Sequence, residues 1–139
     1  MAPFDTRTLP ERRDDLAPDG SDVRVLTRVG RGSAAHFSLA PGCVSVAVMH
    51  RTIDEIWYFL GGEGEFWRKN EEGEEASVQV QHGVSVTIPA RTKFQFRSTG
   101  HDPLTAFGVT MPPWPGSGPR EVEFVVGAWT AKLPTREST

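Results

Sequence analysis

The sequence predicts an all-β protein, a sandwich or a barrel, on three observations. Short runs rich in β-branched and aromatic residues recur along the chain, separated by turn pairs such as Pro41-Gly42 and Gly61-Gly62. Glycine (14) and proline (11) are frequent for a chain of 139 residues, as expected where turns are numerous. No window of about twelve residues repeats its apolar side chains with a helical period. A single domain accounts for this length.

The elements follow in order along the chain. Residues 1–20 are rich in charge and proline, so we expect an extended, poorly ordered arm. Residues 21–130 should form the barrel, and 131–139 a C-terminal tail. Between the last two strands, the proline-rich segment Met111–Pro119 lacks the N–H groups of a central strand and should be a crossing connection. We expect ten strands: Val23–Val29, Ala34–Leu39, Val44–His50, Ile56–Leu60, Glu65–Arg68, Ser77–Gln81, Ser85–Ile88, Lys93–Arg97, Leu104–Thr110 and Val122–Trp129.

Composition excludes several classes of protein. The net charge is −3 and the basic residues are scattered, which disfavours a nucleic-acid partner. No apolar run approaches the roughly 20 residues of a membrane span. The first residues lack the apolar core of a signal peptide, and the single cysteine, Cys43, allows no internal disulfide. We therefore expect a cytoplasmic protein with no membrane partner.

The best candidate site is the pair His50 and Glu55, which flank a short polar connection, 51–54. A hairpin here would place the two on neighbouring strands and turn an imidazole toward a carboxylate. Such side chains bind divalent metals or move protons. Position 48, where a metal site would take a second histidine, holds Val48.

The spacing around this pair resembles the first motif of the cupins. That motif is a glycine, five residues, His-x-His, three or four residues, a glutamate, six residues and a glycine. Residues 42–62 reproduce every interval, and only the first histidine is replaced, by Val48.

A second cupin motif falls on residues 83–98. It is a glycine, five residues, Pro-x-Gly, two residues, a histidine, three residues and an asparagine. Gly83 and Pro89 match, whereas Arg91, Phe94 and Ser98 replace the second glycine, the histidine and the asparagine. The resemblance covers roughly residues 22–111 and implies a double-stranded β-helix, or jelly-roll barrel.

The resemblance also implies which residues would hold a metal. A cupin metal, which is iron, manganese, zinc, nickel or copper, typically has three histidines and the glutamate as ligands. Only His50 and Glu55 match, because Val48 and Phe94 carry no lone pair, and catalytic sites use about three protein ligands. We expect no tightly bound cofactor. A divalent transition metal stays open as the alternative, with His36 as a further ligand if its side chain points inward.

Five other residues are candidates for contact with a small-molecule ligand. Strand alternation places Val48 on the same face as His50, Phe94 on the same face as Phe96, and Trp57 on the same face as Glu55. The alternative is that these side chains simply fill the core. The fifth candidate, Trp114, is stiffened by prolines and either covers the barrel mouth, meets a second subunit or docks on the barrel exterior.

Three hypotheses for function remain open at this point. The first is a small-molecule-binding cupin in which His50 and Glu55 act as acid and base, as in an isomerase, cyclase or dehydratase. The second is a ligand-binding or sensor cupin without catalysis, and the third is a metal-dependent oxygenase with an incomplete ligand set. A buried ion pair usually stabilises a protein no more than hydrophobic residues in the same positions would. The presence of His50 and Glu55 therefore favours a functional role for the pair. Many cupins dimerise through edge strands, so the resemblance implies a homodimer, with 23–29 and 121–129 as candidate edges.

Overall fold

The computed structural model describes residues 4–114 and 120–134, and this part of the chain contains strands and no helix. No segment within it could therefore cross a membrane as a helix. The strands, in chain order, are β1 (Asp15–Leu16), β2 (Asp22–Val29), β3 (Gly32–Leu39), β4 (Val48–His50), β5 (Asp54–Gly61), β6 (Glu63–Lys69), β7 (Glu75–Gln81), β8 (Ser85–Ile88), β9 (Lys93–Ser98), β10 (Leu104–Met111) and β11 (Val122–Phe124).

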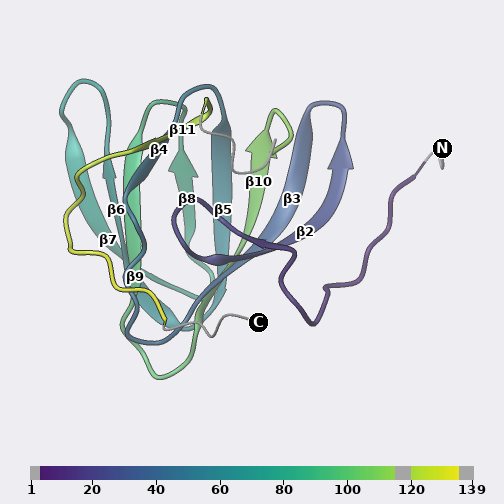
Figure 1. Cartoon of the computed structure of the whole chain (residues 1–139), viewed down its shortest axis with the longest axis horizontal. Coiled ribbons are helices and arrows are strands. Elements are labelled where there is room, and N and C mark those ends of the chain that lie inside the picture. Colours follow the sequence, from purple (N-terminus) through teal and green to yellow (C-terminus); the bar gives the residue numbers. More distant parts are fainter. Residues whose placement is uncertain (1–3, 115–119, 135–139) are drawn as a thin grey trace.

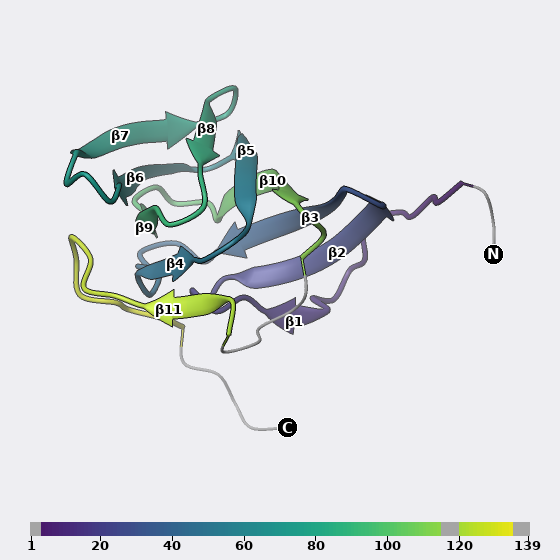
Figure 2. The ribbon, with the colours of Figure 1, turned by 90° about the horizontal axis from the view of Figure 1, so that it is seen from above.

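Two antiparallel sheets face one another, as Figures 1 and 2 show. The six-stranded sheet has the order β1-β2-β3-β10-β5-β8, and the five-stranded sheet has the order β11-β4-β9-β6-β7. Strands that follow each other in the chain often lie in different sheets, so the chain crosses between the two sheets repeatedly. The predicted all-β jelly-roll fold is confirmed.

The core between the sheets is built around Trp57. Its ring stacks on Phe37 with centroids 4.4 Å apart and meets Phe66, Phe94 and Phe96 edge-on. All five side chains are buried. Strand alternation explains the arrangement, because residues spaced two apart on β5 and β9 point to the same face.

The N-terminal segment differs from the sequence prediction. We expected a poorly ordered arm, but it runs along the outer edge of β2 and contributes β1. The Asp14 carboxylate accepts a hydrogen bond from the backbone N–H of Val25 at 2.7 Å, and the Arg24 guanidinium donates to the carbonyl of Pro10 at 2.9 Å. These bonds hold the arm because β2 would otherwise present unpaired backbone groups at a sheet edge.

The C-terminal segment also continues past its expected boundary. The strand predicted at Val122–Trp129 is regular only over β11, and the chain then crosses the outside of the five-stranded sheet. Gln95 holds it there by donating to the carbonyl of Trp129 and accepting from its N–H. Lys132 pairs with Val44, so the domain includes part of the predicted tail. Of the predicted connection Met111–Pro119, residues 115–119 lie outside the described residues.

Candidate functional site

His50 and Glu55 face each other across the interior. His50 ends β4 in the five-stranded sheet, whereas Glu55 lies near the start of β5 in the six-stranded sheet. The expected hairpin is therefore wrong: the connection 51–53 crosses between the two sheets. Nε2 of His50 lies 3.5 Å from Oε2 of Glu55, and the two residues are only 6% and 4% exposed.

Glu55 is a buried carboxyl with one oxygen engaged. Oε1 accepts a hydrogen bond from the indole N–H of Trp57 at 3.0 Å, but Oε2 has no hydrogen-bond partner among the described residues. The pKa of Glu55 is raised to about 7. Burial is the largest cause, the Trp57 hydrogen bond acts against it, and the charges of Asp19 and Glu121 add to the rise. The group can therefore gain or lose a proton near neutral pH.

Burial favours the neutral form of the His50 imidazole. Burial lowers its pKa, and the nearby charge of Glu121 acts in the opposite direction. Its Nδ1 is buried and has no hydrogen-bond partner within the described part of the chain. The pair therefore contains two buried polar atoms that lack a hydrogen-bond partner among the described residues, one from each sheet.

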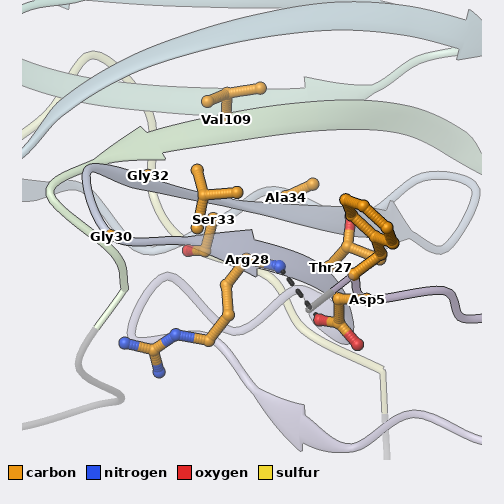
Figure 3. A pocket seen from close by; sticks show the side chains of 10 residues that line it. Asp5, Thr27, Arg28, Gly30, Gly32, Ser33, Ala34 and Val109 are labelled. Carbon is orange, nitrogen blue, oxygen red and sulfur yellow. Dashed lines mark hydrogen bonds between the residues drawn. The ribbon is translucent and has the colours of Figure 1, made fainter. Parts of the chain in front are cut away.

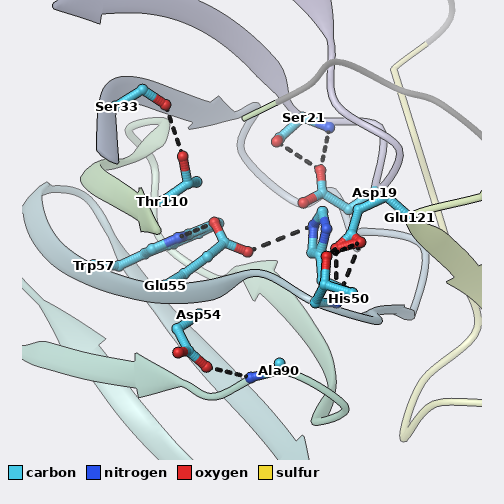
Figure 4. A network of polar contacts seen from close by, with 11 residues as sticks. Asp19, Ser21, Ser33, His50, Asp54, Glu55, Trp57, Ala90, Thr110 and Glu121 are labelled. Atoms are coloured by element: carbon cyan, nitrogen blue, oxygen red, sulfur yellow. Dashed lines mark hydrogen bonds and ion pairs between the residues drawn. The ribbon is translucent and has the colours of Figure 1, made fainter. Parts of the chain in front are cut away.

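Two further carboxyls complete the polar cluster in Figure 4, and sequence reasoning missed both. Asp19, in the turn between β1 and β2, is buried and accepts from the N–H and hydroxyl of Ser21; burial raises its pKa. Glu121, just before β11, accepts from the N–H and hydroxyl of Thr52. The sequence gives no signal that either carboxyl lies near His50 and Glu55. Asp19 falls in the arm that we expected to be poorly ordered, and the path of the connection before Glu121 cannot be predicted from its sequence.

Hydroxyl groups lie beside Glu55 on the inner face of the same sheet. Thr110 on β10 is paired in register with Glu55, and Ser33 on β3 is paired with Thr110. The Ser33 and Thr110 hydroxyl oxygens are 2.7 Å apart, and the backbone N–H of Trp114 donates to Ser33 at 2.9 Å. Trp114 is half-buried against the core, so it lies at the end of the barrel that holds the pair.

The other candidate ligand-contacting residues belong to the core. Val48 and Phe94 are register partners and are both buried, and the Phe94 ring lies parallel to the His50 ring with centroids 6.1 Å apart. Trp57 and Phe96 belong to the aromatic cluster. Of these residues, Trp57 touches the pair directly, through its bond to Glu55.

The donor set does not fit a tightly held metal ion. His50 and Glu55 supply two donor side chains, and no group of three potential ligands occurs among residues 4–114 and 120–134. His36 cannot complete the set, because alternation along β3 places the buried Ala35 and Phe37 on the inner face and His36 on the outer face.

Two cavities of the described structure lie away from the pair. One of about 980 Å³ is formed outside the six-stranded sheet, at the hairpin between β2 and β3 (Figure 3). A second, of about 360 Å³, borders the C-terminal segment between Val125 and Ala131. Neither is lined by His50 or Glu55. The low exposure of both residues shows that the pair is enclosed by the surrounding side chains.

Comparisons with known proteins agree with the fold. Uncharacterized protein MJ1618 of Methanocaldococcus jannaschii is 30% identical over 104 residues, which cover 71% of this chain and 79% of that protein. The crystal structure of BH2720 from Bacillus halodurans matches with a TM-score of 0.62 and 22% identity, over 69% of this chain and 74% of that one.

Oxalate decarboxylase from Bacillus subtilis at pH 4.6 matches with a TM-score of 0.72 and 14% identity, over 90% of this chain but only 33% of that one. A further structure of that enzyme, which matches with a TM-score of 0.63 and 15% identity, concerns its Mn(II) centres. The Cupin domain family model matches residues 35–110. The chain therefore belongs to the cupin domain family.

Proposed function

We propose that this cupin binds a small, uncharged organic molecule beside His50 and Glu55 and moves a proton within it. The observation that carries the proposal is that two buried atoms, Nδ1 of His50 and Oε2 of Glu55, have no hydrogen-bond partner among the described residues. A buried polar atom without a partner costs about 1–3 kcal/mol. A ligand that offers a donor or an acceptor to these atoms would recover part of that cost.

The charge around the pair favours a neutral ligand. Asp19 and Glu121 lie close enough to Glu55 for their charges to act on it. No Lys or Arg side chain in the described structure forms an ion pair or hydrogen bond with these carboxyls. An anion would be repelled, whereas a molecule with carbonyl and hydroxyl groups would not.

The proposed chemistry is an isomerisation of the proton-transfer type. Oε2 of ionised Glu55 takes a proton from the carbon next to a carbonyl group, and the electron pair of that C–H bond moves toward the carbonyl oxygen. An N–H of His50 supplies the proton for this oxygen, and return of both protons yields the isomer. With a pKa of about 7, Glu55 can both take the proton from carbon and return it at neutral pH.

The first test uses a panel of neutral hydroxycarbonyl compounds, including glyceraldehyde, dihydroxyacetone and hydroxyacetone. Each is incubated with the protein in D₂O, and loss of the C–H signal is followed by proton NMR. We expect exchange with at least one compound, slowed about 100-fold or more in Glu55→Gln. Exchange that is unchanged in Glu55→Gln would contradict the assignment.

The same compounds separate catalysis from binding alone. The enclosure of His50 and Glu55 by core side chains favours a binding protein without turnover as the second candidate. A rise in the melting temperature with a panel compound, without exchange, would support that candidate. If no compound in the panel gives either a shift in melting temperature or exchange, both candidate functions are overturned.

A separate test concerns the metal. We expect metal analysis of the purified protein to give far less than one divalent ion per chain. Val48→His, which adds a third donor beside His50, should increase metal retention and serves as the positive control. A stoichiometric metal in the natural protein, lost in His50→Ala, would instead support the oxygenase hypothesis.

A further inference from the structure

One row of side chains on the inner face of the six-stranded sheet is polar throughout. Thr110 on β10 is paired in register with Ser33 on β3 and with Glu55 on β5, so the three side chains lie in line across neighbouring strands. Thr110 and Glu55 are buried, and Ser33 is half-buried. The fold therefore sets two hydroxyl groups beside the carboxyl of the candidate site. We call Ser33, Thr110 and Glu55 the polar row.

The other inward rows of the same three strands are apolar and buried. The next row consists of Ala35, Gly108 and Trp57, and the one after it of Phe37, Ala106 and Phe59. A hydroxyl group in such a face is costly to bury unless it is hydrogen-bonded. The polar row is also the last inward row at its end of the barrel, because β10 ends at Met111 and β5 begins at Asp54. A ligand that enters from this end reaches the polar row first.

The two hydroxyl groups leave one hydrogen atom without an acceptor. Their oxygens are 2.7 Å apart, and either hydroxyl can donate this bond. The Ser33 hydroxyl oxygen also accepts from the backbone N–H of Trp114. A hydroxyl carries one hydrogen, and neither group makes a further hydrogen bond among the described residues, so the second hydrogen is unused. When Ser33 donates to Thr110, the unused hydrogen is that of Thr110, the hydroxyl beside Glu55.

We propose that the Thr110 hydroxyl binds a hydroxyl group of the ligand, so that the site selects α-hydroxycarbonyl compounds over simple carbonyl compounds. The inference rests on the proposed function of His50 and Glu55. In that function Glu55 takes a proton from the carbon next to a carbonyl group, and His50 faces the carbonyl oxygen from the opposite sheet. Thr110 lies beside Glu55 in the same sheet, so its hydroxyl meets a hydroxyl carried by the carbon that loses the proton (Figure 4).

A ligand hydroxyl completes the hydrogen bonding of the polar row. It accepts the unused hydrogen of Thr110, whereas a methyl group in the same place leaves that hydrogen buried and unpaired. Sites built to bond a substrate hydroxyl discriminate strongly against the analogue that lacks it. Thr110 is therefore the residue that we expect to determine this specificity.

The test compares two compounds that differ at one position. Hydroxyacetone carries a hydroxyl group on the carbon next to the carbonyl, and butanone carries a methyl group there. Deuterium exchange of this CH₂ group in D₂O is followed by proton NMR, and the uncatalysed rate is subtracted. Thr110→Val, which keeps the shape and removes the hydroxyl, should lower kcat/KM for hydroxyacetone about tenfold or more and change that for butanone by less than about twofold. Thr110→Ser keeps a hydroxyl and should retain the preference.

Two further variants guard the interpretation. Thr105→Val is the matched control, because it makes the same substitution on the same strand at an outward position, and it should change neither rate. Thr110→Ala also removes the hydroxyl and should act as Thr110→Val does, which keeps the test decisive where Thr110→Val is unstable. Circular dichroism and melting curves establish that each variant is folded.

The outcomes separate this inference from the proposed function. Exchange that depends on Glu55, but that Thr110→Val changes equally for the two compounds, overturns the role of Thr110 and leaves the proposed function in place. If neither compound shows exchange that depends on Glu55, the inference is overturned, and the other compounds of the panel decide the proposed function separately.

Discussion

At the scale of the residue, Glu55 shows how enclosure sets the chemistry of a carboxyl group. The Trp57 indole stabilises its ionised form through one hydrogen bond, but burial and two neighbouring carboxyls favour the protonated form more strongly. The position of Glu55 follows from motif spacing in the sequence. Its proton affinity depends on Asp19 and Glu121, which come from distant parts of the chain.

Glu55→Gln should change how stability depends on pH. The folded-state pKa of Glu55 is raised from 4.5 to about 7, so its stabilising contribution is complete below pH 4.5 and is lost as pH rises to about 7. Glutamine can still accept the Trp57 bond and does not ionise. The variant should therefore gain free energy of unfolding relative to the natural protein between pH 4.5 and 8, by at most about 3 kcal/mol.

Urea unfolding of both proteins at several pH values measures this difference. The pKa of His50 is lowered by burial, so its own contribution rises with pH up to its ordinary value of 6.5, in both proteins. Subtracting the free energy of unfolding of the natural protein from that of Glu55→Gln at each pH removes most of the His50 contribution. Parallel curves across the whole range would show that Glu55 titrates normally.

At the scale of the element, β2 depends on the arm that precedes it. The sequence of the arm by itself predicts a poorly ordered segment, because a stretch rich in charge and proline cannot form a core of its own. In the structure its carboxylates instead accept hydrogen bonds from backbone N–H groups of β2, such as those of Val25 and Arg28. This role was not predictable from the arm's sequence, because it exists only once the edge of β2 has formed.

Asp14→Ala should loosen this edge locally. The bond from the Val25 N–H lowers the pKa of Asp14, so the carboxylate is ionised and holds the amide at all but acidic pH. We expect hydrogen exchange of the Val25 amide to speed up at least about tenfold once its acceptor is removed. The control is Asp15→Ala, whose carboxylate bonds only the neighbouring N–H of Leu16 among the contacts described. Equal exchange of Val25 in both variants would contradict the role of Asp14.

At the scale of the whole molecule, the two sheets differ in what covers their outer faces. The C-terminal segment lies on one of them and is held by Gln95, a fully buried amide that bonds Ser45 and Trp129. The other face leaves the side chains of Ile56, Tyr58, Leu60 and Phe107 exposed. This asymmetry is a property of the folded chain as a whole, because it depends on where the C-terminal segment packs.

Gln95→Leu should release the C-terminal segment. The substitution leaves the carbonyls of Ser45 and Trp129 and the N–H of Trp129 without their partner, so we expect a loss of about 2–4 kcal/mol in the free energy of unfolding. Denaturant unfolding measures it. Gln79→Leu, at an exposed position on β7, is the matched control and should change stability by no more than about 0.5 kcal/mol. Equal losses in the two variants would mean that the Gln95 bonds contribute little.

Local patterns along the chain are enough to predict the class of fold and the residue types at the heart of the site. Alternation and turn residues are local properties, and the intervals that place Val48, His50, Glu55 and Phe94 are counted along one chain. The replacement of two cupin histidines by Val48 and Phe94 can therefore be read directly from the amino-acid sequence.

How the site is assembled depends instead on tertiary packing. The folded chain has His50 and Glu55 in opposite sheets and His36 on the outer face, and it brings in Asp19 and Glu121 from its two ends. In the same way, Trp57, Phe94 and Phe96 fill the core. The physical reason is that burial and charge act through space: the proton affinity of a carboxyl depends on every group within several ångströms, and sequence distance does not measure that separation.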